Sequence, residues 1–119
     1  RALYSNPPRH GGALAAAVLA DADLRRLWVQ EVEAMRLRIR NVRRQLVEGL
    51  AARETGADFS FIERQNGMFS FSGLNDDQVR FLREEKGIYL VKGGRLNVAG
   101  LNTANLAYVC DAIAESLKA

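Results

Sequence analysis

Apolar residues recur at helical spacing through the first half of the chain. The positions step by three or four residues and comprise Leu24, Trp28, Val32, Met35, Ile39, Val42, Leu46 and Leu50. Such a stripe is typical of one face of an amphipathic helix, and Asp21 or Asp23 offers a side-chain oxygen to cap its start. The pattern predicts one long helix over about 21–53, preceded by a short alanine-rich helix over about 13–20.

The predicted long helix would measure roughly 45 Å at 1.5 Å per residue, more than a domain of this size needs for its own core. We therefore expect part of its apolar face to contact other sequence or a second copy of the chain. Ahead of the helices, Asn6-Pro7-Pro8 and Gly11-Gly12 disfavour regular structure. Residues 1–12 are predicted to form an extended loop.

The second half of the chain changes to shorter, alternating runs. Two aromatic-rich runs, 59–62 and 68–71, flank Gln65-Asn66-Gly67. Because Asn-Gly between alternating runs favours a tight turn, this stretch predicts a β-hairpin. A second pair of runs, 88–91 and 95–99, surrounds a turn with two glycines and predicts another strand pair.

Two further helices complete the pattern. Asn75 is expected to cap a helix that begins at Asp76 and closes at Gly87, and a last helix is expected to begin near Asn102. The apolar positions of the last helix are Leu106, Val109, Ile113 and Leu117. The predicted fold class is α+β, with a small sheet of two strand pairs packed with helices.

Length and composition agree with one folded domain. The chain has 119 residues, of which 48% are apolar and 26% charged, and no apolar run is long enough to span a bilayer. We therefore expect no membrane partner. The single cysteine, Cys110, lies among apolar residues at helical spacing, so it is expected to fill core space and to fit a reducing, cytoplasmic setting.

The chain is basic, with a net charge of +3, but its arginines are concentrated in the predicted long helix. Five of them recur every few residues, namely Arg36, Arg38, Arg40, Arg43 and Arg44. Their spacing between apolar positions predicts a solvated helical face. Because no aromatic residues interleave with these charges and no nucleic-acid reader motif is present, we expect no nucleic-acid partner.

Arg95 is the strongest candidate for binding chemistry, since it opens a strand-like segment directly after a glycine turn. A guanidinium presents a rigid planar fork that matches a carboxylate with two parallel hydrogen bonds. The residue type alone leaves two hypotheses open. Arg95 binds an external carboxylate, or it forms an internal ion pair with an Asp or Glu of this chain.

Three stretches of the chain carry a resemblance to a known family. They are Tyr4-Ser5-Asn6-Pro7-Pro8, Asn66-Gly67-Met68-Phe69-Ser70-Phe71-Ser72-Gly73 and Gly94-Arg95-Leu96-Asn97-Val98-Ala99-Gly100. In order and spacing the chain resembles the C-terminal third of the class I aspartate and aromatic amino-acid aminotransferases over essentially all 119 residues. The resemblance implies the small C-terminal domain of a fold type I enzyme, a homodimer, and pyridoxal 5'-phosphate held on a lysine as a Schiff base.

The resemblance assigns roles to four residues. It implies that Arg95 binds the substrate α-carboxylate and that Phe69 closes over the substrate side chain. Arg1 is implied to reach across the dimer interface to a distal carboxylate, and Ser5 to lie near the cofactor of the neighbouring subunit. Without the resemblance, Phe69 would be a core strand residue and Arg1 a frayed end.

The resemblance also implies what this chain lacks. Its lysines are Lys86, Lys92 and Lys118, and none follows the serine-containing loop that carries the Schiff-base lysine in the family. We therefore predict no catalytic residue and no metal site in this chain. The longer enzyme is expected to be an aminotransferase, whereas these 119 residues alone are expected to be inactive.

Two substrate classes stay open within the family. A pocket with two arginines suits aspartate and glutamate, while the aromatic members keep Arg1 and still use 2-oxoglutarate as acceptor. The segment Gly100-Leu101-Asn102-Thr103-Ala104-Asn105 resembles the aromatic members more, which favours tyrosine and phenylalanine. The alternative from another class is a stand-alone amino-acid-binding module that uses Arg95 without catalysis. Two local strand pairs after a very long helix disfavour it.

The resemblance divides the chain into three parts. Residues 1–20 are expected to be an interface loop and short helix, 21–53 the long connecting helix, and 54–119 the small C-terminal domain. The isolated chain is expected to self-associate through its uncovered apolar surface.

Overall fold

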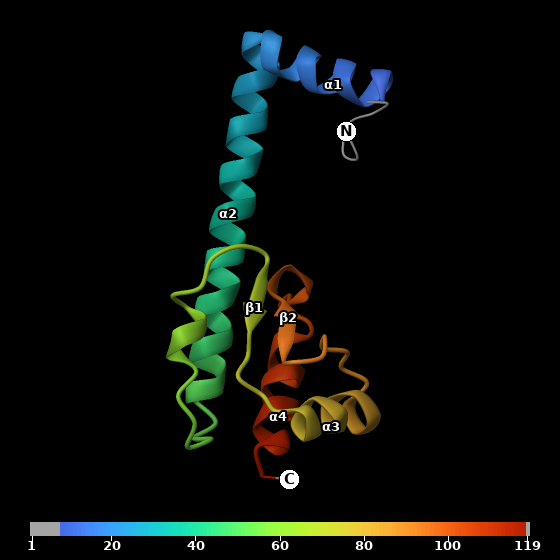
Figure 1. Cartoon of the computed structure of the whole chain (residues 1–119). Coiled ribbons are helices and arrows are strands. Elements are labelled where there is room, and N and C mark those ends of the chain that lie inside the picture. The colour runs from blue at the N-terminus through green and yellow to red at the C-terminus, as the bar shows by residue number, and fades with distance from the viewer. Residues whose placement is uncertain (1–7, 119) are drawn as a thin grey trace. The chain divides into compact units, whose positions relative to one another are not determined.

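The structure is a computed structural model that describes residues 8–118 (Figure 1). Its elements are α1 (Arg9–Ala20), α2 (Ala22–Ala51), η1 (Ser60–Ile62), β1 (Phe69–Phe71), α3 (Asp76–Lys86), β2 (Arg95–Asn97), η2 (Val98–Gly100) and α4 (Leu106–Ser116). They fall into two compact units, Arg1–Leu37 and Arg38–Ala119. The division into three parts stays a prediction. Within the described residues no helix is both long and apolar enough to cross a membrane.

The start of α1 corrects the predicted extended loop. The helix begins at Arg9, so Gly11 and Gly12 lie inside it, and the amide of Gly12 donates to the Pro8 carbonyl at 3.0 Å. A glycine weakens a helix by about 1 kcal/mol but does not forbid it, and a proline directly before the first turn loses no helical hydrogen bond. The extended-loop prediction was therefore wrong for residues 9–12.

The start of α2 confirms the predicted cap. One carboxylate oxygen of Asp21 accepts hydrogen bonds from the amides of Asp23 and Leu24, both at 2.9 Å. These amides have no partner inside the helix, so the cap stabilises the first turn. From there α2 runs without interruption for 30 residues, close to the predicted bounds.

The apolar face of α2 is buried only in its C-terminal part. Its buried residues are Val42, Arg43, Leu46 and Leu50. Apolar side chains nearer its start are exposed, and they include Leu24, Leu27, Trp28, Val29, Val32, Met35 and Leu37. As the sequence predicted, the helix is longer than the core of the second unit requires.

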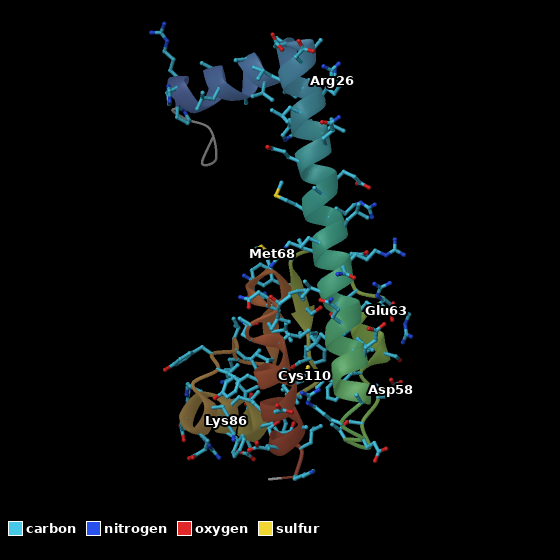
Figure 2. The ribbon with its side chains drawn as sticks, turned by 180° about the vertical axis from the view of Figure 1, so that it is seen from behind. Arg26, Asp58, Glu63, Met68, Lys86 and Cys110 are labelled. Atoms are coloured by element: carbon cyan, nitrogen blue, oxygen red, sulfur yellow. The ribbon has the colours of Figure 1, made fainter. Side chains whose placement is uncertain are left out.

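The core of the second unit joins the end of α2 to α3, α4 and the strands. Its fully buried apolar side chains are Leu46, Leu50, Ile62, Leu82, Val98 and Cys110. Cys110 is 0% exposed, which confirms its predicted place in the core (Figure 2). A Cβ atom at Gly49 of α2 would lie 2.8 Å from the Cys110 sulfur, so only glycine allows this close approach of α4.

The sheet consists of β1 and β2, which pair antiparallel with Ser70 opposite Leu96. The predicted hairpin of 59–62 with 68–71 was wrong, because residues 60–62 form a short 3-10 turn. An Asp58 carboxylate oxygen accepts the Ser60 amide at 2.8 Å and so favours that turn.

The second predicted strand pair is reduced to one bridge. Of the run 88–91, only Val91 pairs, and its partner is Arg95. The Ile88 amide instead donates to the Leu82 carbonyl at 2.9 Å, which closes the end of α3. The sheet therefore has one strand pair and a bridge instead of two local pairs.

The helix α3 has the predicted ends. Asn75 and Gln78 form a reciprocal capping box at its start, and Gly87 closes it in the left-handed conformation at φ 63°. The last helix, α4, begins at Leu106, four residues after the predicted start. The side chain of Asn102 caps a turn ahead of it instead, by accepting the amides of residues 104 and 105.

Candidate functional site

The exposed face of the small sheet carries the candidate site. Along each strand the middle residue is buried and its neighbours are exposed, as period-two alternation requires. The register places Phe69 opposite Asn97 and Phe71 opposite Arg95. These four side chains therefore share one face, which we call the sheet face.

Arg95 and Phe69 are diagonal neighbours on the sheet face. The guanidinium carbon of Arg95 lies 5.3 Å from the centroid of the Phe69 ring, within the range of a cation–π interaction. The ring contacts the flat face of the guanidinium and so orients it. The N–H groups, which point outward in the guanidinium plane, can still donate hydrogen bonds to a ligand. The structure thus brings together two of the residues predicted to bind substrate.

The ion-pair hypothesis for Arg95 finds no support in residues 8–118. None of the salt bridges among them involves Arg95. A guanidinium on an exposed sheet face without an internal carboxylate is suited to an external anion. The geometry is therefore compatible with the predicted carboxylate-binding role, which stays a prediction.

The hypothesis that Phe69 is a core residue was wrong. Its side chain is 47% exposed, whereas Ser70, the next residue, is 2% exposed and faces the interior. The strand therefore presents its aromatic side chains outward, which is unusual unless another surface covers them. Arg1 and Ser5 lie outside the described residues, so their predicted roles are not addressed by the structure.

Gly94 fixes the backbone from which Arg95 projects. Its φ of 75° lies in the left-handed region, and a Cβ atom there would lie 2.8 Å from the Ser72 hydroxyl and 2.9 Å from the Leu74 carbonyl. The Gly94 carbonyl accepts the Ser72 amide at 2.8 Å. Position 94 therefore admits glycine alone. The hydrogen bond to Ser72 ties the start of β2 to the end of β1.

An apolar groove of about 330 Å³ borders β2, lined by residues of α4, the 88–90 segment and Asn97. Neither Arg95 nor Phe69 lines it. The groove therefore meets the sheet face only at Asn97, and it adds no charged group to the candidate site.

Arg43 is a buried residue next to the sheet that the sequence analysis placed wrongly. It was predicted on a solvated helical face, yet it is only 2% exposed. Its guanidinium donates to the carbonyls of Ile62 at 3.3 Å and Phe69 at 3.1 Å, and also to the Gly67 carbonyl and the Ser70 hydroxyl. The available signal was its position three residues before Leu46, on the apolar side of α2.

The electrostatics of Arg43 are those of a buried cation held by neutral oxygens. Burial lowers the pKa of its guanidinium from the usual value. Among residues 8–118 no carboxylate lies within salt-bridge distance of it. Arginine stays charged in proteins, so its carbonyl and hydroxyl partners must satisfy the charge.

Lys86 does not fit the attachment of the cofactor that the resemblance implies. Lys86 forms an ion pair with Glu115 and lies 5.7 Å from the Phe81 ring centroid (Figure 2). The hydrogen bond that Lys86 donates to the Glu115 carboxylate raises the pKa of Lys86, whereas a lysine that forms a Schiff base must be able to lose its proton. Lys92 lies in the turn before β2, and Lys118 follows α4. Within residues 8–118 no cluster of His, Cys, Asp or Glu could hold a metal ion.

Comparison with known proteins gives a consistent result. The family model described as aminotransferase class I and II matches residues 1–113. The chain is 52% identical over 113 residues to an aspartate aminotransferase of Salmonella typhi, covering 95% of this chain and 28% of the relative. It is 47% identical over 115 residues to an aromatic-amino-acid aminotransferase of Pseudomonas aeruginosa, covering 97% of this chain and 29% of the relative.

Solved structures agree with the sequence relatives. An aromatic-amino-acid aminotransferase from Burkholderia pseudomallei, covalently bound to pyridoxal phosphate, is 60% identical with a TM-score of 0.91. The match covers 96% of this chain and 29% of that one. The chain thus spans less than a third of the length of the proteins that it matches.

Proposed function

This chain belongs to the family of class I and II aminotransferases, and on that premise we propose that it forms the C-terminal part of an enzyme transferring an amino group between an L-amino acid and a 2-oxo acid. The observation that carries the proposal is the family match over residues 1–113 together with the shared sheet face of Arg95 and Phe69. Neither relatedness nor the exposed arginine would suffice alone.

In the proposed enzyme Arg95 binds the α-carboxylate of the substrate through its planar fork. Phe69 covers the substrate side chain and holds the guanidinium in place, as its 5.3 Å contact with Arg95 suggests. Both residues orient the substrate and exclude water. In this way they strengthen substrate binding and bring the reacting groups into position.

The proposed cofactor is pyridoxal phosphate, which supplies an electron sink when bound. The Burkholderia relative carries it covalently, while Lys86 of this chain is paired with Glu115, and none of the three lysines follows the serine-containing loop that the resemblance implies. The attachment lysine would therefore lie in sequence outside these 119 residues, and the chain alone would be inactive. We also propose a homodimer, in which Arg1 and Ser5 serve the neighbouring subunit's site.

For substrates we propose aromatic L-amino acids first and aspartate second, with 2-oxoglutarate as acceptor. The 60% identity to the aromatic-amino-acid aminotransferase from Burkholderia supports this order. Among the sequence relatives the aspartate aminotransferase of Salmonella typhi, at 52%, exceeds the aromatic-amino-acid aminotransferase of Pseudomonas aeruginosa, at 47%, which keeps the dicarboxylic class in view. A cytoplasmic location stays a prediction.

The test is a transamination assay of the complete gene product with tyrosine and with aspartate. Arg95→Ala is expected to lower kcat/KM for both substrates alike by roughly 100-fold or more, because two charge-assisted hydrogen bonds are lost. Arg83→Ala is the control, since Arg83 is exposed and its ion pair within residues 8–118 is with its neighbour Glu84 on α3. An unchanged kcat/KM in Arg95→Ala would remove Arg95 from the site.

Arg1 separates the two substrate classes. Arg1→Ala is expected to lower kcat/KM for aspartate at least about tenfold and to leave tyrosine nearly unchanged, because only aspartate carries a second carboxylate. Equal damage to both substrates would contradict the role proposed for Arg1.

A further inference from the structure

The residues that flank β1 on either side form backbone hydrogen bonds with the residues that flank β2. The Met68 carbonyl accepts the Val98 amide at 2.9 Å, and the Ser72 amide donates to the Gly94 carbonyl at 2.8 Å. In an antiparallel pair the residues between such bonded positions point their backbone groups the other way. The amides and carbonyls of residues 69 and 71 therefore face the outer edge of β1, where the described residues supply no third strand.

Side chains satisfy this outer edge in place of a strand. The Phe71 amide donates to the Gln65 side-chain oxygen at 2.9 Å, and the Phe71 carbonyl accepts the Gln65 side-chain amide at 3.2 Å. The Phe69 carbonyl accepts from the Arg43 guanidinium at 3.1 Å. The position of Phe69 along the edge thus depends on a side chain of α2.

Three of the four acceptors of Arg43 lie within residues 67–70, and the fourth is the Ile62 carbonyl. A planar fork that reaches several oxygens at once fixes their relative positions. Losing such a fork leaves buried acceptors unpaired, and each unpaired acceptor is costly. Ser70 meets the guanidinium from the buried face of the strand, while Phe69 projects on the opposite face.

We propose that Arg43 is a positioning residue, which fixes segment 67–70 and thereby holds Phe69 beside Arg95. Its effect on catalysis rests on the proposed function, whereas its hold on the segment does not. Arg43 touches no substrate in this proposal and acts only through Phe69.

The first experiment measures amide hydrogen exchange in the complete gene product. Arg43→Lys keeps the charge and the aliphatic stem but cannot reproduce the planar fork. Exchange across residues 67–71 is expected to rise roughly tenfold, with the rest of the core unchanged. The matched control is Arg44→Lys, because Arg44 is exposed and pairs with Asn41 and Glu48. Unchanged or uniformly faster exchange would overturn the proposal.

The second experiment is a double-mutant cycle on kcat/KM for tyrosine. Arg43→Lys is expected to lower kcat/KM roughly tenfold alone and less than about twofold in a Phe69→Ala background, because it acts through Phe69. Equal losses in both backgrounds would show a general structural role and overturn the proposal. Should Arg43→Lys fail to fold, Ser70→Ala removes one acceptor and is expected to give the same localised exchange.

The two readouts separate the proposals. An inactive wild type with localised exchange in Arg43→Lys would sink the proposed function and keep the hold of Arg43 on the segment. An active wild type with unchanged exchange in Arg43→Lys would keep the proposed function and overturn the proposed hold of Arg43 on the segment.

Discussion

Helix α2 passes through two regions with opposite surroundings. In residues 8–37 no described side chain is buried, and Leu27, Trp28 and Val29 are about half exposed. In residues 38–118 the same helix buries Leu46 and Leu50 almost completely. The apolar period is continuous through both, so it marks which face a helix will bury and says nothing about what buries it.

The difference between the two regions indicates how much of the fold is self-sufficient. The second region closes its own core, and its helix α3 carries a complete capping box. The first region presents apolar side chains that a folded protein rarely leaves uncovered over a large patch. Four substitution experiments test this contrast.

The largest expected effect is the loss of a core leucine. Leu46→Ala should lower the free energy of unfolding of the chain by about 3–4 kcal/mol, because Leu46 is 0% exposed and a cavity would remain. Leu37→Ala, on the same helix but 49% exposed, should cost less than about 1 kcal/mol. Denaturant unfolding followed by circular dichroism measures both. Similar losses would mean that the regions do not differ.

The next effect concerns self-association of the 119-residue chain. Sedimentation velocity is expected to show dimers or larger assemblies, and Trp28→Gln should raise their dissociation constant roughly 10- to 100-fold by removing an aromatic contact. Tyr89→Gln is the control, because Tyr89 is 80% exposed in the second region. A chain that sediments only as a monomer would refute the prediction that its exposed apolar surface drives self-association.

Helix caps of similar chemistry should have different consequences in the two regions. Asn75→Ala removes the capping box of α3 and is expected to cost about 1 kcal/mol of the unfolding free energy. Asp21→Ala removes a comparable cap of α2, but it should only fray the helix start and lower the helical signal. Equal shifts of the unfolding midpoint would show that both regions unfold as one unit.

The smallest effect is a pH dependence confined to the second region. The Ser60 amide and hydroxyl bond the Asp58 carboxylate and lower its pKa below the usual 3.8. A folded-state pKa below the unfolded one adds stability above the unfolded pKa, and that stability is lost as pH falls through the folded pKa. Asp58→Asn should therefore differ from wild type by a constant amount above about pH 5 and by less toward pH 2. A gap that stays constant to pH 2 would contradict this.

Local signals in the sequence predicted α2 and α3 well. The ends of α3 follow from Asn75 and Gly87, and the start of α2 from Asp21, because a cap requires only neighbours in the chain. The stripe of apolar residues predicted α2 itself, since it persists over many turns.

The ambiguity of short runs and the partners distant in sequence decided what the sequence could not predict. Over four residues the buried pair Phe59 and Ile62 fits a helical turn as well as a strand, and Asp58 tips the balance toward the turn. The true partner of β1 is β2, across the whole of α3. Arg43 was misplaced for the same reason, because its acceptors at 62 and 67–70 are brought to it only by folding.

The candidate site was predicted by resemblance and only in part by residue type. Arg95 could be singled out from the glycine turn before it, whereas Phe69 could not be told from a core residue until the strand register was known. Exposure on one sheet face is what links the two residues, and exposure follows from the pairing of strands far apart in sequence.

The close approach of Cys110 to Gly49 gives the second region a chemical reporter of its own opening. Burial raises the pKa of the Cys110 thiol, so the reactive thiolate is scarce, and the sulfur lies against α2. A thiol reagent can reach this single cysteine only when α4 leaves α2. The rate at which native protein is labelled therefore measures how often that pair of helices separates, and no cysteine has to be engineered into the chain.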